Sequence, residues 1–173
     1  TTVALFSMHG AIYLAMKTEG RLFAKVTMLL RKAIIFFVVS FGIVSLYTLI
    51  YIPHLSDDFK QSPALFAVPL LAFLSIANVP RLASKGRFRL AFLFSAITVA
   101  LLLILVAIEL YPVIIVSTID PAYNLTVYNA ASSEKSLGIM LLMAAIGAPM
   151  VASYTIFVFW TFRGKVKLDD TSY

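Results

Sequence analysis

The sequence contains no cysteine and few charged residues. Of its 173 residues only 13% are charged, whereas a soluble domain usually has about 25%. Without a thiol the chain can form no disulfide, no thiolate metal site and no cysteine-bound iron–sulfur cluster. The small share of charge leaves too little polar surface to coat a water-soluble globule. The shortage of charge points away from a soluble domain, whereas the absence of cysteine does not indicate a compartment.

Short motifs of common catalytic sites are also missing. The sequence holds no Walker loop, no glycine-rich dinucleotide turn, no Ser-His-Asp or paired-carboxylate arrangement and no zinc signature. We therefore expect no catalytic site, metal or cofactor on this chain itself. The net charge of +6 lies in loops and the tail rather than along one folded face, so we expect anionic lipid and not nucleic acid as its partner.

What the sequence does have is long apolar runs, with 61% hydrophobic residues and a mean hydropathy of +0.97. Four runs without Lys, Arg, Asp or Glu contain 24, 20, 19 and 27 residues, at 33–56, 61–80, 90–108 and 136–162. A helix of roughly 20 residues crosses a hydrocarbon core of about 30 Å. Each run is therefore long enough for one span.

These runs predict an all-α fold, a polytopic membrane helix bundle forming a single transmembrane domain over 1–173. The five predicted spans are about 1–17, 33–53, 63–80, 88–111 and 136–162. The first run has only 16 residues before Lys17 and begins with Thr1 and Thr2, without an initial Met or a basic flank. We therefore expect this helix to be truncated and the chain to be part of a longer protein.

Basic residues alternate between the gaps and predict an orientation. Twelve of the fourteen are Lys17, Arg21, Lys25, Arg31, Lys32, Arg81, Lys85, Arg87, Arg89, Arg163, Lys165 and Lys167. They occupy the first gap, the third gap and the tail, while Lys60 and Lys135 are alone in the other two. Because positive loops stay inside, we predict a cytoplasmic C-terminus, a cytoplasmic amphipathic segment at 18–32 and a cytoplasmic tail at 163–173.

Prolines and cap residues predict where the helices bend and end. A kink is expected near Pro69, and the third span is expected to end at Pro80. Turns are expected in the gap 112–135, which contains Pro112, Pro121, Asn124 and Asn129. Ser132 or Ser133 can cap the last helix, with Glu134 in its first turn, and Pro149 favours a bend within it.

Apart from basic residues at span ends, the spans contain one histidine and one acid, His9 and Glu109. Such residues are costly in lipid and are functional hypotheses by default. His9 could bind a haem iron or relay protons, but it stands alone in sequence, which favours a structural role in helix packing. Glu109 lies at the end of its span, where its carboxylate can reach water without any function; a proton exit is the alternative.

Three groups of residues resemble the subunit II family of cytochrome bd quinol oxidases. They are 8–11 (MHGA), 13–14 (YL) and 17–20 (KTEG); then 128–133 (YNAASS), 136–137 (SL) and 147–149 (GAP); then 154–155 (YT), 162–166 (FRGKV) and 172–173 (SY). They are similar to the fourth helix with its cytoplasmic exit, to the last loop and helix, and to the C-terminal end of that subunit. Their order and spacing together make the match specific.

The resemblance implies spans four to eight of an eight-helix subunit in a bacterial or archaeal cytoplasmic membrane. It implies a complex that oxidises quinol, reduces dioxygen to water and contributes to the proton-motive force. Haem b and haem d would belong to the partner, subunit I, and this chain would be haem-free, supporting assembly and proton access. A small single-helix subunit is a further potential partner. The family's proton-access positions lie in its N-terminal helices, so no site residue transfers to this sequence.

A different class remains open from the residues alone. A transporter or carrier could line a central site with helices kinked at Pro69 and Pro149 and couple protons through Glu109 or His9. Small faces at Ser7 and Gly10 and around the alanines near Gly147 are candidate contacts with other helices or subunits.

Overall fold

The computed structural model describes residues 1–51 and 63–165 and divides the chain into two compact units. We call Thr1–Glu109 the N-terminal unit and Leu110–Gly164 the C-terminal unit. Residues 52–62, which include the end of the span predicted at 33–53 and the gap after it, lie outside the described ranges, as do the tail residues 166–173.

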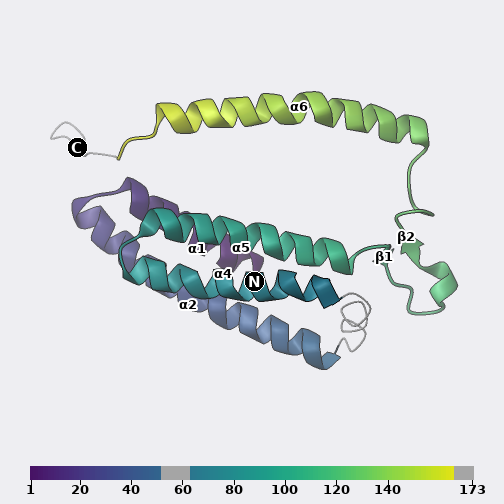
Figure 1. Cartoon of the computed structure of the whole chain (residues 1–173), viewed down its shortest axis with the longest axis horizontal. Coiled ribbons are helices and arrows are strands. Elements are labelled where there is room, and N and C mark those ends of the chain that lie inside the picture. Colours follow the sequence, from purple (N-terminus) through teal and green to yellow (C-terminus); the bar gives the residue numbers. More distant parts are fainter. Residues whose placement is uncertain (52–62, 166–173) are drawn as a thin grey trace. The chain divides into compact units, whose positions relative to one another are not determined.

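Helices make up the N-terminal unit. They are α1 (Thr2–Lys17), α2 (Gly20–Tyr51), the 3-10 turn η1 (Pro63–Phe66), α4 (Ala67–Ser84) and α5 (Phe88–Glu109). Figure 1 shows these helices side by side, with α1 packed on α2 and α5, and α4 along α5. The predicted all-α fold class is confirmed.

Four described helices are long and apolar enough to cross a membrane: α2, α4 with part of η1, α5, and α6 of the C-terminal unit (Glu134–Thr161). The helix α1 has 16 residues and is shorter than these four. The proposed count of five spans therefore depends on α1, whose membrane crossing stays a prediction.

The segment 18–32 and the span predicted after it form one helix. After Thr18, the C-cap of α1 with extended backbone, the chain turns at Gly20, whose φ of +59° is in the left-handed region that favours glycine. From there α2 continues for 32 residues. Since 21–51 contains only one glycine and no proline, nothing in the local sequence ends the helix at Lys32.

Helix α4 differs from its prediction at both prolines. The helix begins at Ala67, so Pro69 falls in the first turn, where a missing N–H breaks no intrahelical hydrogen bond and no mid-helix kink is required. Beyond the predicted span end at Pro80 the helix continues to Ser84, with Pro80 inside it, and the end of the span itself stays a prediction. Val79, beside this proline, is fully buried, and burial of an apolar side chain stabilises the helix at this position.

A Schellman turn ends α4 and reverses the chain into α5. The Gly86 N–H donates to the Ala83 carbonyl, and the Arg87 N–H donates to the Leu82 carbonyl. The nitrogen–oxygen distance is 3.0 Å in each bond. Gly86 has a φ of +70°, as the residue after such a helix end commonly does.

The C-terminal unit contains a small hairpin followed by one long helix. Strands β1 (Val113–Ile115) and β2 (Leu125–Thr126) pair antiparallel around the 3-10 turn η2 (Pro121–Tyr123), before α6. The predicted turns are confirmed, and Ser133 caps α6 by accepting from the Ser136 N–H, with Glu134 in the first turn. Pro149 lies inside α6 without ending it.

Candidate functional site

A polar cluster lies between the helices of the N-terminal unit, around His9. The His9 Nδ1 is 2.8 Å from the Ser95 Oγ of α5, and its ring stacks on Phe92 with centroids 4.4 Å apart. One helical turn along α1, the ring of Tyr13 is 5.8 Å from that of Phe92. His9 therefore joins α1 to α5 through one hydrogen bond and one aromatic contact.

The hydrogen bonds around Ser95 assign a proton to His9. Ser95 is fully buried, and its hydroxyl donates a hydrogen bond to the Phe92 carbonyl, with an oxygen–oxygen distance of 2.7 Å. A hydroxyl has one proton to donate, so the Ser95 oxygen accepts from His9. This hydrogen-bond network places a proton on the His9 Nδ1.

Two more buried hydroxyls extend the cluster towards α4. Ser75 donates to the Phe94 carbonyl over 2.9 Å, and the Thr98 Oγ1 lies 3.2 Å from the Ser75 Oγ. Some described residues that are not exposed carry buried side-chain nitrogen or oxygen atoms. Each of these atoms has a hydrogen-bond partner. A polar group in lipid without a partner is costly, so this pairing stabilises the packing of α4 on α5.

The structure does not bring the two predicted residues together. His9 meets the middle of α5 at Ser95, whereas Glu109 is the last residue of that helix and is exposed. At 1.5 Å per residue, positions 95 and 109 are about 21 Å apart along the helix. The two residues therefore form no joint acid–base pair, and a functional role for either stays a prediction.

Sequence reasoning missed the partners of His9. Ser95, Thr98 and Ser75 are the buried hydroxyls of the cluster, and two of them are three residues apart on one face of an otherwise apolar helix. That spacing was a usable signal. The Ser7 and Gly10 face, which the sequence favours for contact with other helices or subunits, is exposed within the N-terminal unit, and its contact stays a prediction.

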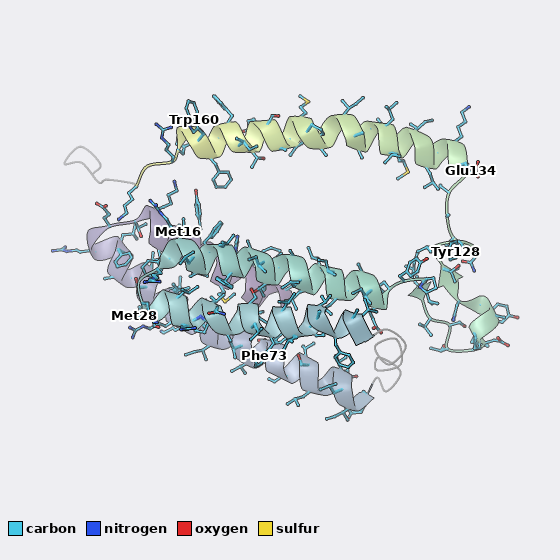
Figure 2. All side chains as sticks on the ribbon, viewed as in Figure 1. Met16, Met28, Phe73, Tyr128, Glu134 and Trp160 are labelled. Atoms are coloured by element: carbon cyan, nitrogen blue, oxygen red, sulfur yellow. The ribbon has the colours of Figure 1, made fainter. Side chains whose placement is uncertain are left out.

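A second polar cluster lies in the hairpin of the C-terminal unit. The hydroxyls of Tyr111 and Tyr128 are 2.6 Å apart, and Figure 2 labels Tyr128 on this hairpin. This hydrogen bond is the main cause that raises the pKa of Tyr128 above its ordinary value of 10.0, because it favours the neutral phenol.

The fit of these residues to a haem or metal is poor. Within 1–51 and 63–165 no group of three or more His, Cys, Asp or Glu side chains could hold a metal ion. His9 is the single histidine of those ranges, and it belongs to no such group.

Comparison with known proteins identifies the chain. The family described as cytochrome bd terminal oxidase subunit II matches residues 1–162. The chain belongs to this family. The predicted subunit II membership is confirmed, and the match includes both His9 and the whole of α6.

Named relatives of the chain are bacterial. Cytochrome bd-I ubiquinol oxidase subunit 2 of Escherichia coli K12 is 23% identical over 195 residues, covering 98% of this chain and 52% of the relative. Cytochrome bd ubiquinol oxidase subunit 2 of Bacillus subtilis is 27% identical over 174 residues, covering 96% and 48%. The chain spans about half the length of these curated relatives, and their names do not support the carrier alternative.

Proposed function

We propose that this chain is the C-terminal part of the haem-free subunit II of a cytochrome bd-type terminal quinol oxidase. The complex would oxidise quinol, reduce dioxygen to water and contribute to the proton-motive force. The observation that carries the proposal is the subunit II family match over residues 1–162. The names of the relatives, which are subunits of ubiquinol oxidases, support the same substrate class.

The role of the chain in this complex is indirect. Haem b and haem d, bound to subunit I, would supply the oxygen chemistry, while this chain contributes a helix surface that supports assembly and proton access. Two surfaces fit that role because their side chains are exposed within their own units: the Ser7 and Gly10 face of α1 and the face of α6 around Gly147. Small residues let a neighbouring helix approach closely.

The basic segments would lie on the cytoplasmic side of the membrane. The Arg87 and Arg89 end of α5 and the start of α2 would face the cytoplasm, and Glu109 would then lie at the outer surface. The C-terminus would be cytoplasmic in a bacterial or archaeal inner membrane, with lipid, quinone and a small single-helix subunit as further partners.

The test is deletion and complementation of the full-length subunit in the native membrane. Deletion is expected to abolish haem d absorbance in the purified complex and quinol-driven oxygen consumption, and the unaltered subunit restores both. Activity per haem separates the two roles, since a defect in assembly lowers haem content whereas a defect in proton access lowers turnover at constant haem. Full oxidase activity without the subunit would contradict the proposal, as would solute transport by the purified subunit alone in liposomes.

A further inference from the structure

The segment between α5 and α6 exposes its apolar side chains. We call residues 110–133 the connecting lobe; it holds β1, η2 and β2. Four of its large side chains are highly exposed, Ile119 at 89%, Tyr128 at 71%, Tyr123 at 70% and Val116 at 69%. Exposed apolar groups gathered on one small segment indicate a surface that meets something other than water.

Polar groups of the connecting lobe are instead used inside it. The Asn124 Oδ1 accepts a hydrogen bond of 2.7 Å from the Ser117 N–H. The Asn129 Oδ1 accepts one of 2.7 Å from the Thr126 N–H. The Asn129 Nδ2 donates to the Asn124 carbonyl over 2.8 Å. Backbone groups paired in this way need no water, and in a water-poor environment an unpaired one is costly.

Charge is nearly absent from the same segment. Asp120 is the single Lys, Arg, Asp or Glu in 110–133, and its carboxylate accepts from the Ala122 N–H over 2.7 Å at the start of η2. A protein partner recognised by charge would find little to pair with here. Exposed tyrosines beside aliphatic residues are typical of the membrane–water interface.

The chain tethers the connecting lobe to the membrane at both ends. The helices before and after it, α5 and α6, are both long and apolar enough to cross a bilayer. From Glu109 to Val113 the backbone reaches at most about 14 Å, so β1 begins close to the end of α5. The apolar surface is therefore held within reach of lipid whichever side of the membrane it faces.

We propose that the connecting lobe lies on the bilayer and places its apolar side chains among the lipid headgroups and upper acyl chains. The occupant of this surface is lipid, in the leaflet at which α5 ends and α6 begins. Ile119 and Tyr123 enter the interface, while the paired asparagines keep the backbone satisfied. The proposal is independent of oxidase activity.

Site-directed spin labelling tests this contact, because the chain has no native cysteine. Ile119→Cys and Tyr123→Cys are made in the full-length subunit, isolated with any chain that accompanies it and placed in nanodiscs. The same assembly without the introduced cysteine, labelled in the same way, measures the background. Lys85→Cys is the matched control, since Lys85 is an exposed residue in another connection between two long helices. Collision rates with oxygen, which is enriched in lipid, and with a water-soluble nickel chelate are then measured.

Lipid contact predicts an oxygen-to-nickel collision ratio several-fold higher at Ile119 and Tyr123 than at Lys85. High nickel accessibility at both lobe positions would overturn the proposal in favour of a water-facing loop. Immobilised labels shielded from both reagents would also overturn it and indicate a protein partner. If labelling disturbs folding, Ile119→Trp in a Trp160→Phe background provides a second readout, with fluorescence quenching by brominated lipid expected and its absence contradicting the contact.

Discussion

The two units differ in how much of their helix surface is buried by other helices of the same unit, although both have similarly apolar sequences. In the N-terminal unit Phe37, Ile12 and Ala91 are fully buried between helices, and three hydroxyls are paired beside them. In the C-terminal unit α6 has 28 residues and none is buried. Lipid tails are as apolar as leucine, so composition does not reveal which face meets a neighbour. The difference between the units comes from their packing partners.

The largest expected effect is a loss of stability when a buried ring of the N-terminal unit is removed, compared with an exposed ring of the C-terminal unit. Phe37→Ala removes a fully buried ring that lies 5.9 Å from the ring of Phe41, and the cavity should cost about 3 kcal/mol. Phe157→Ala in α6, where the ring is 62% exposed, is the control. Detergent unfolding midpoints measure both. An equal loss at Phe157 would show that α6 is packed against a neighbour and would break the comparison.

Two glycines should respond with opposite signs. Gly86 has a φ of +70°, so Gly86→Ala forces an L side chain into the left-handed region and should cost about 1–2 kcal/mol. Gly138 lies inside α6 with no atom within 4 Å of an added Cβ, and Gly138→Ala should stabilise by about 0.5–1 kcal/mol. The same unfolding assay checks both variants. If both changed the stability in the same direction, the backbone conformation assigned to one of the two glycines would be contradicted.

A smaller effect is expected from the hydrogen bond between α1 and α5. Ser95→Ala removes the acceptor of His9 and should cost about 1 kcal/mol. A double-mutant cycle with His9→Phe measures the coupling directly. Ser153→Ala is the matched control, because its hydroxyl bonds the Pro149 carbonyl of its own helix over 2.8 Å. No coupling between positions 9 and 95 would contradict the assigned proton.

The smallest effect concerns the tyrosine pair. Because its hydrogen bond with Tyr111 raises the pKa of Tyr128, the folded lobe holds this proton more tightly than the unfolded chain. The contribution to stability is thus complete below the ordinary pKa of 10.0 and is lost as the pH rises through the raised value.

Tyrosinate absorbance checks this pair as a difference between the parent and Tyr128→Phe. Tyr111→Phe should lower the pKa of Tyr128 towards its ordinary value, whereas Tyr123→Phe should leave the Tyr128 titration unchanged. An unchanged titration in Tyr111→Phe would mean that the two hydroxyls do not bond in solution.

The fold class could be predicted from run length and charge because lipid requires helices. Cap positions were equally local: Ser133 and Glu134 start α6 as their chemistry predicts. The end of α4 could not be predicted, because tolerance of Pro80 depends on how Val79 packs. The spacing of Ser95 and Thr98 marks a polar face on α5, but it does not indicate that the partner of this face is His9, which lies 86 positions from Ser95 in the sequence.

The unbroken course of α2 has a mechanical consequence. Its 32 residues extend about 48 Å at 1.5 Å per residue, whereas the hydrocarbon core is about 30 Å thick. Roughly 18 Å must therefore stand outside the core or be absorbed by tilt. The apolar residues from Ala33 to Tyr51 fit inside, so the projecting end is the one that carries Arg21 and Lys25. Because α2 is one uninterrupted helix, a displacement of its charged end would tilt the part that lies in the bilayer.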